Sequence, residues 1–232
     1  MYLTYNLNLT NIDMDCKLIG NVYQALEVTL APREVFYAER GAMIYMDSGI
    51  EQDVQMNGSG LMGVLSSKLS GESLFLIKFT NMSNYAQKLT ISGHSGSLKH
   101  IKITTGQTLI LRRGDYVGSN NKVNIDLNIS VNKFLTGSGF AFQKVTGDST
   151  VFFDCVDSLI TRDLAPGEEI IVDENHIKAL LGIDDSRISI QRNTNIIKNL
   201  VSGEGWLLTR ITGPGKVFLS SVPSSIYRQQ SI

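Results

Sequence analysis

Short runs of alternating apolar and polar residues dominate this chain, and Gly, Pro, Asn and Asp separate the runs from one another. Alternation with a period of two is typical of β-strands that bury one face. Runs rich in β-branched and aromatic residues occupy positions 22–30, 73–79, 108–112, 141–145, 150–154, 169–172, 187–191 and 216–220. The pattern therefore predicts an all-β protein.

A glycine motif recurs at a fixed spacing along the chain. Gly71, Gly137 and Gly203 each follow Ser or Thr and precede an apolar strand pattern, and consecutive copies lie 66 residues apart. Glycine at such a position ends a helix at little steric cost, because it has no Cβ atom. We therefore expect a few short helices, one before each glycine, at 60–69, 130–135 and 195–201.

A second motif, made of an apolar residue, a turn and an apolar strand, lies upstream of each glycine. Its copies begin at Leu30, Ile103 and Leu164, with Pro32 and Pro166 in two of the turns. Recurring periods of this length indicate an internal repeat, whose units cover one another's open strand edges. We predict a single domain over residues 1–232. Its repeats span approximately 21–92, 93–158 and 159–222, in a pseudo-threefold arrangement.

Three basic residues obey the 66-residue period and form one candidate site. Lys78, Lys144 and Arg210 each follow two large apolar residues on the same face of the repeated strand. If the three cations gathered around an axis, their mutual repulsion would require an anion or nearby carboxylates. In the other interpretation, each base lies at a strand end and keeps its charge in water.

Trp206 lies next to this pattern, as the first large apolar residue of the third copy, where it is a candidate for ligand stacking or for a core contact. Signs of catalysis are absent from the sequence. It contains no H-x-H, H-E-x-x-H, C-x-x-C or G-x-S-x-G motif, and its three histidines are His94, His100 and His176. We predict a protein that is not an enzyme and has no metal site and no cofactor.

Charge and cysteine usage narrow the location and the partners. The chain of 232 residues carries 21 basic and 22 acidic residues, a net charge of −1, which argues against binding to nucleic acid. Cys16 and Cys155 are too few for a disulfide framework in a chain of this length. The N-terminal residues lack the pattern of a signal peptide, and no apolar run could span a bilayer. These features predict a cytoplasmic protein.

Several stretches resemble the altered-inheritance-of-mitochondria protein twenty-four family, which includes many bacterial proteins of unknown function. They are LEVTLAPREVFYAERGAMIYMD from Leu26, LSGESLFL from Leu69, LAPGEE from Leu164 and VSGEG from Val201. The resemblance implies a β-roll or double-stranded β-helix-like fold related to the tryptophan RNA-binding attenuation protein. For eukaryotic members it also implies a role in organising the mitochondrial inner membrane.

The functional expectation combines these features. We expect a non-enzymatic β scaffold that forms homo-oligomers and binds an unidentified protein partner, with peripheral contact to a membrane surface as a further expectation. The alternative is a small-ligand or anion-binding module that uses Lys78, Lys144 and Arg210.

Overall fold

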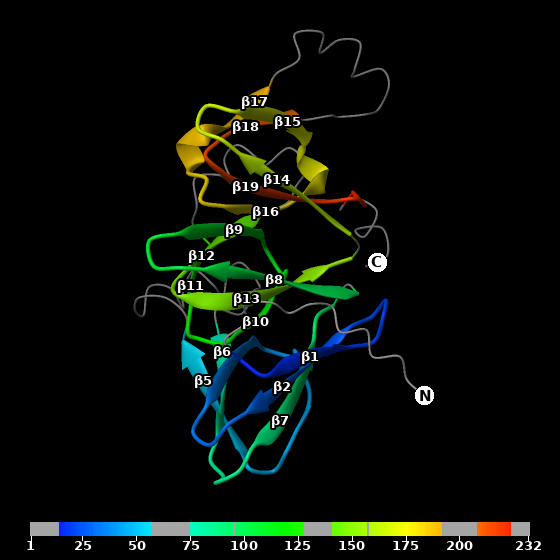
Figure 1. The fold of residues 1–232 in the computed structure, drawn as a ribbon, viewed down its shortest axis with the longest axis vertical. Coiled ribbons are helices and arrows are strands. Elements are labelled where there is room, and N and C mark those ends of the chain that lie inside the picture. The colour runs from blue at the N-terminus through cyan, green and yellow to red at the C-terminus, as the bar shows by residue number, and fades with distance from the viewer. Residues whose placement is uncertain are drawn as a thin grey trace. The chain divides into compact units, whose positions relative to one another are not determined.

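The computed structural model describes residues 14–56, 75–94, 96–127, 141–156, 158–191 and 208–223 (Figure 1). Within these ranges the chain consists of antiparallel strands and two short 3-10 turns, so the predicted all-β class is confirmed. The helices expected at 60–69, 130–135 and 195–201 lie outside the described residues.

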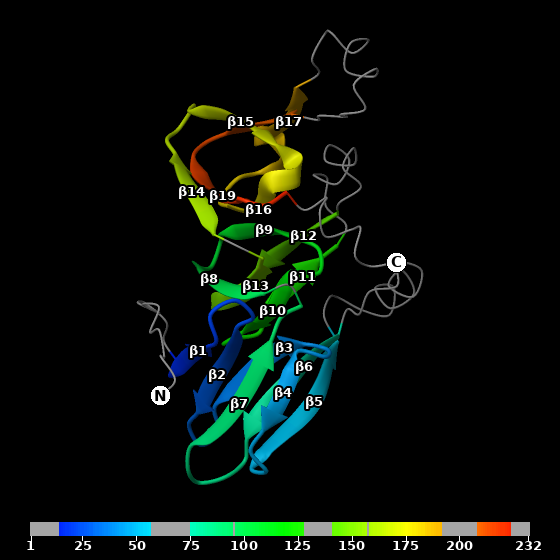
Figure 2. The ribbon, with the colours of Figure 1, turned by 90° about the vertical axis from the view of Figure 1, so that its right-hand side faces the viewer.

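The strands form two compact units. The first unit contains the described residues of 1–106, 115–125 and 146–156, and the second contains those of 107–114, 126–145 and 157–232. The first unit is a sandwich of two sheets, and several of its strands are seen side by side in Figure 2. One sheet has the order β1 (Cys16–Ile19), β2 (Ala25–Leu30), β7 (Gln87–Ser92), β4 (Met43–Met46). We call it sheet A. The other has the order β5 (Ile50–Met56), β6 (Phe75–Asn81), β3 (Val35–Glu39), β10 (Tyr116–Ser119), β13 (Ser149–Cys155), β8 (Ser97–Ile103).

Alternation along the strands builds the core of the first unit. In β2 the side chains of Leu26, Val28 and Leu30 are fully buried, and they pack with Phe36 of β3 and Phe152 of β13. Because successive side chains of a strand point to opposite faces, the intervening Glu27 and Thr29 lie on the other face of sheet A. The core therefore fixes which residues of sheet A face outward.

The second unit also contains two sheets. The larger has the order β11 (Asn124–Asp126), β12 (Phe142–Thr146), β9 (Thr108–Arg112), β16 (Ile177–Leu181), β19 (Gly215–Ser220), β14 (Leu159–Leu164). The chain passes between the two units several times, and one of these passages lies within β11. The smaller sheet, which we call sheet D, has the order β15 (Glu169–Asp173), β18 (Leu208–Thr212), β17 (Ile188–Gln191). The 3-10 turns are Glu174–His176 and Asp185–Arg187. Ile110, Leu180 and Val217 of the larger sheet pack with Val172 and Ile211 of sheet D.

One pairing pattern occurs three times along the chain. In the set β2–β7, the first strand pairs with the sixth, the third with the sixth, the second with the fifth, and the fourth with the fifth. The sets β8–β13 and β14–β19 follow the same rule. Two further pairings join consecutive sets: β10 with β3, and β16 with β9. The pseudo-threefold arrangement of the repeats stays a prediction, and so does the single domain.

A β-bulge marks the third strand of each set. The register shifts between Met43 and Tyr45 in β4, between Tyr116 and Gly118 in β10, and between Ile177 and Ala179 in β16. A bulge inserts an extra residue, bends the strand and increases its twist. The third strands of the three sets are thus bent at matching places.

Candidate interaction surface

The third strand of the first set, β4, lies at an edge of sheet A. Within the described part of the chain it pairs with β7 alone, whereas β10 and β16 are each paired on both sides. All residues of β10 and β16 are buried. In β4, by contrast, the exposed fractions are 37% for Met43, 53% for Ile44 and 47% for Tyr45. We call these three residues the open edge of sheet A.

A row of side chains crosses the outer face of sheet A and ends at this edge. Across the strands, Lys17 lies opposite Glu27, Glu27 opposite Thr90, and Thr90 opposite Tyr45. Directly opposed residues on one face of an antiparallel sheet have Cβ atoms about 5 Å apart, so their side chains are in direct contact range. The row therefore connects β1, β2, β7 and β4 at one level of the sheet.

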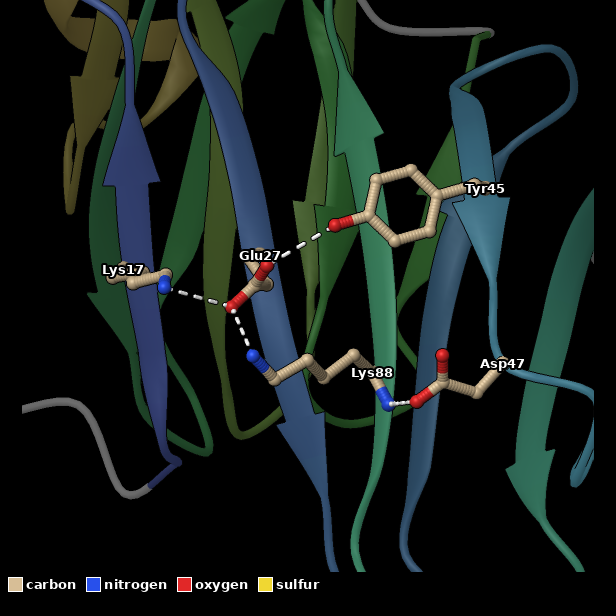
Figure 3. A network of polar contacts seen from close by, with 5 residues as sticks. All are labelled: Lys17, Glu27, Tyr45, Asp47 and Lys88. Carbon is tan, nitrogen blue, oxygen red and sulfur yellow. Dashed lines mark hydrogen bonds and ion pairs between the residues drawn. The ribbon is translucent and has the colours of Figure 1, made fainter. Parts of the chain in front are cut away.

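The carboxylate of Glu27 is the centre of the row. It accepts hydrogen bonds from Lys17 Nζ at 2.9 Å, from Lys88 Nζ at 3.1 Å and from Tyr45 Oη at 3.1 Å (Figure 3). The Glu27 side chain is only 8% exposed, while both lysine side chains are about half exposed. The Lys88 backbone N–H also donates to Asp47 Oδ2 at 2.8 Å, just after β4. These contacts hold the Tyr45 ring at the edge of the sheet.

The pKa of Glu27 reflects two opposing effects. Burial raises it, and the hydrogen bonds from Lys17, Lys88 and Tyr45 lower it more, so the carboxyl group titrates below its usual range. The same contact raises the pKa of Lys88. Glu27 therefore remains ionised at neutral pH, and two cations and a phenol neutralise it within the face.

Replacing Glu27 with glutamine is expected to destabilise the protein by about 1 kcal/mol at neutral pH, because the lysines lose a charged acceptor but remain hydrated. A group whose pKa is lowered by folding contributes stability above its ordinary pKa, here about 4.3, and loses it as pH falls through the folded value. In urea unfolding, the difference in the free energy of unfolding between wild type and Glu27→Gln should therefore shrink as the pH falls below about 4.3. Asp163→Asn, which removes the exposed Lys216–Asp163 pair, should change stability by less than about 0.5 kcal/mol. A pH-independent difference would contradict this assignment.

The basic residues singled out in the sequence lie in different sheets. Lys78 is in β6 of the first unit, opposite Tyr37 of β3 and Asp53 of β5. Lys144 is in β12 of the second unit. Their meeting at an axis stays a prediction.

Arg210 has a counter-charge of its own. It is in β18 of sheet D and forms an ion pair with Glu169 of β15, a carboxylate that also accepts a hydrogen bond from Thr212 Oγ1. Arg210 thus forms a partly exposed ion pair with a carboxylate on the neighbouring strand. Trp206 lies outside the described residues.

Titratable groups elsewhere in the described ranges form no metal centre. In the part of the chain that the structure describes, no three His, Cys, Asp or Glu side chains are grouped to hold a metal ion. His100 lies in β8, half-buried, with its ring 6.1 Å from that of Phe152, and burial together with Lys99 lowers its pKa. His176 Nδ1 lies 2.7 Å from the carbonyl oxygen of Ser220. These histidines have structural contacts.

Cys16 is expected to react slowly with alkylating reagents. Burial and the neighbouring Asp15 raise the pKa of its thiol to about 11, and the thiolate is the reactive form. At pH 8 the native thiol should be alkylated about 100-fold more slowly than the same residue in urea, because a thiol with a pKa of about 11 carries far less thiolate than an unfolded cysteine. Iodoacetamide labelling followed by mass spectrometry measures both rates. Equal rates in the native and unfolded protein would contradict the burial of this thiol.

The fold and the surface together define the class: an all-β protein of antiparallel sheets with an apolar edge strand on its first sheet. The chain belongs to the mitochondrial biogenesis AIM24 family, whose sequence profile matches residues 16–222. The family resemblance read from the sequence motifs is thereby confirmed.

A solved structure supports the fold. The crystal structure of a Streptococcus pyogenes protein, determined as a structural genomics target, has a TM-score of 0.66 and 20% identity to this chain. The match covers 94% of this chain and 97% of that one. At this identity the likeness shows the fold alone. The search of curated proteins found no match. Within the described ranges, the helical segments are short 3-10 turns, and none has the length and apolar character needed to cross a membrane.

Proposed function

We propose that this protein is a β scaffold that self-associates through the open edge of sheet A. The observation that carries the proposal is the exposure of Met43, Ile44 and Tyr45 at a strand position that is buried in both other sets. An edge strand offers a row of backbone N–H and C=O groups to another chain. Apolar side chains beside that row add burial to the hydrogen bonds.

The composition of the edge supports this proposal. Proteins protect open edges with charged residues, prolines, bulges or a covering segment. The four residues of β4 are Met, Ile, Tyr and Met, so a bulge is the one such device within the strand itself. The Glu27 contacts fix the Tyr45 ring in place, which reduces the conformational entropy that binding would cost. The edge is therefore ordered before it meets a partner.

Native mass spectrometry of wild type and of Ile44→Lys tests the proposal. We expect an oligomer for wild type and about a 10-fold or greater loss of association for the variant, because a charge would be buried at the contact. Ile160→Lys is a matched control, because Ile160 is 52% exposed on β14, the edge strand of another sheet. Its replacement should leave the number of chains in the oligomer unchanged.

The contrary outcomes are distinct. A wild-type protein that stays monomeric at micromolar concentration overturns the proposal. An Ile44→Lys variant that forms the same oligomer as wild type overturns it as well. Co-sedimentation with anionic phospholipid vesicles gives a third readout. Vesicle binding that depends on Ile44 in a monomeric protein would assign the edge to a membrane surface instead.

For the location, we propose the cytoplasm. Neither Cys16 nor Cys155 forms a disulfide, as expected in a reducing compartment. Separation of cell fractions followed by immunodetection tests this, and recovery from an oxidising compartment would overturn it.

A further inference from the structure

We propose that β4 of one copy pairs antiparallel with β15 of a second copy, with Tyr45 opposite Val172 and Met46 opposite Ile171. This inference rests on the proposed self-association and names the strand that the open edge binds. It follows from the two joints between consecutive sets of strands that the structure contains.

Both joints pair the third strand of one set with the second strand of the set before it. In the first joint, Gly118 of β10 lies opposite Ala38 of β3. In the second joint, Ala179 of β16 lies opposite Leu111 of β9. In sequence, Ala179 lies 61 positions after Gly118, its counterpart in the third strand of the preceding set. Leu111 lies 73 positions after Ala38, its counterpart in the second strand of the preceding set. The two joints thus define matching positions in all three sets.

Two strands of these types lack a joint. In the described residues, the third strand β4 pairs with β7 alone, and the second strand β15 pairs with β18 alone. Equivalent residues of the first and second sets lie 73 positions apart, so the counterpart of Gly118 in the first set is Tyr45. Equivalent residues of the second and third sets lie 61 positions apart, so the counterpart of Leu111 in the third set is Val172. A joint of the observed kind between β4 and β15 therefore places Tyr45 opposite Val172.

Independent features show that these positions are equivalent. The bulges of β4, β10 and β16 begin at Met43, Tyr116 and Ile177, which are separated by the same 73 and 61 residues. The strands β3 and β15 begin after the same turn. In one turn the Ala31 backbone N–H donates to Glu34 Oε2 at 2.7 Å, and in the other the Ala165 N–H donates to Glu168 Oε2 at 2.9 Å.

The burial of the side chains indicates the same partner. Ile171 at the centre of β15 is 48% exposed, whereas its counterpart Ile110 in β9 is fully buried, and Tyr37 in β3 is only 9% exposed. The charged ends of β15 are occupied locally, since Glu169 pairs with Arg210 and Asp173 accepts a hydrogen bond from the Asn175 N–H. The middle of β15, between its two charged ends, is thus apolar, as is the open edge of sheet A.

The joint would complete a sheet of the type already present twice. The order β2-β7-β4 of sheet A followed by β15-β18-β17 of the second copy repeats the orders β8-β13-β10-β3-β6-β5 and β14-β19-β16-β9-β12-β11. Each copy offers one β4 and one β15, so the contact is head to tail. Contacts of this kind either close into a ring or continue as a filament.

Disulfide trapping between separate polypeptides tests the register. Tyr45→Cys and Val172→Cys proteins are mixed under mild oxidation, because directly opposed strand positions bring Cα atoms within disulfide range. We expect a covalent dimer from this mixture on non-reducing gels. Tyr45→Cys mixed with Ile160→Cys is the control, since Ile160 lies on the edge strand of another sheet and at 52% exposed is more accessible than Val172, yet it should give no dimer. Thermal unfolding confirms that each variant is folded.

The outcomes separate this inference from the proposed function. An oligomeric wild type without a covalent 45–172 dimer overturns the register and leaves self-association standing, and a monomeric wild type overturns both. A Tyr45→Cys/Val172→Cys double variant that cross-links within a dilute monomer overturns the second copy as the occupant. Ile171→Lys provides a measurement without cysteines. It should weaken association about 10-fold, as Ile44→Lys does, and wild-type association in this variant would contradict the pairing.

Discussion

Replacing Arg112 with methionine is expected to lower the free energy of unfolding by about 3–5 kcal/mol, a large effect for a single charged side chain. The Arg112 side chain is 5% exposed and lies over the Phe142 ring, 5.6 Å from its centroid. Its guanidinium donates to the carbonyl oxygens of Ile177, Glu174 and Asn175, with a shortest distance of 2.7 Å to Ile177. Methionine fills similar space but leaves these carbonyls without their donor.

Two variants separate the hydrogen bonds of Arg112 from its charge. Arg112→Lys keeps the charge but lacks the planar fork that reaches three carbonyls, so most of the loss should remain. Arg162→Met removes an arginine whose pair with Glu168 is exposed, and it should cost less than about 1 kcal/mol. Urea unfolding followed by circular dichroism gives the comparison. An Arg112→Met protein within about 1 kcal/mol of wild type would show that these carbonyls find other donors.

Replacing Phe152 with alanine is expected to destabilise the first unit by about 3–5 kcal/mol. Phe152 is 1% exposed, and its ring lies 6.0 Å from the Phe36 ring at an angle of 44°. Truncation removes buried apolar area and leaves a cavity that the two sheets cannot fill without shifting. Hydrogen exchange across β13 and β8 should show the loss locally. Tyr85→Ala removes a tyrosine that is 69% exposed and should change stability by less than about 0.5 kcal/mol.

The same variant has a second readout at His100. Burial lowers the pKa of His100, which lies opposite Phe152 on β8, so its contribution to stability is present above the ordinary histidine range and is lost as pH falls. If alanine at 152 admits water, the pKa of His100 should rise toward its ordinary value in an NMR titration. An unchanged pKa together with unchanged stability would mean that the core closes over the missing ring.

The strands were the most predictable part of the fold. The strand predicted at 22–30 is present as β2 from Ala25 to Leu30, with its apolar residues in the core and Glu27 on the other face. The repeated motifs that begin at Leu30, Ile103 and Leu164 run from the last residue of the first strand of each set through a turn into its second strand, and the second strands pair alike in each set. These features depend on local turn chemistry and on period-two burial, which a single sequence displays directly.

The Glu27 contacts could not be predicted in the same way. A glutamate on the outer face of a strand is ordinarily exposed, and its burial here requires Lys17, Lys88 and Tyr45 from three other strands. Those partners follow from the cross-strand register, which the turns and bulges decide. The bulge at Met43 shifts the register of β4, so the position opposite Thr90 is Tyr45. No motif in the sequence signals this shift.

The period of the basic residues identifies positions on equivalent strands, but it does not by itself predict a site. Lys78, Lys144 and Arg210 do occupy β6, β12 and β18, the fifth strand of each set. Equivalent positions in a repeated strand do not by themselves bring side chains into contact, because contact also depends on the sheets to which the strands belong. For Arg210, the carboxylate of Glu169 on the neighbouring strand satisfies the charge locally.

The division of the middle set of strands has a consequence for synthesis of the chain. Its strands β8, β10 and β13 belong to the first unit, while β9 and most of β12 belong to the second. A nascent chain therefore cannot finish the first unit until residue 156 has emerged from the ribosome, although chains generally fold from the N-terminus onward. Until then β10 and β8 lack their shared neighbour β13, and a ribosome that stalls between residues 107 and 145 would expose an incomplete sheet to chaperones and proteases.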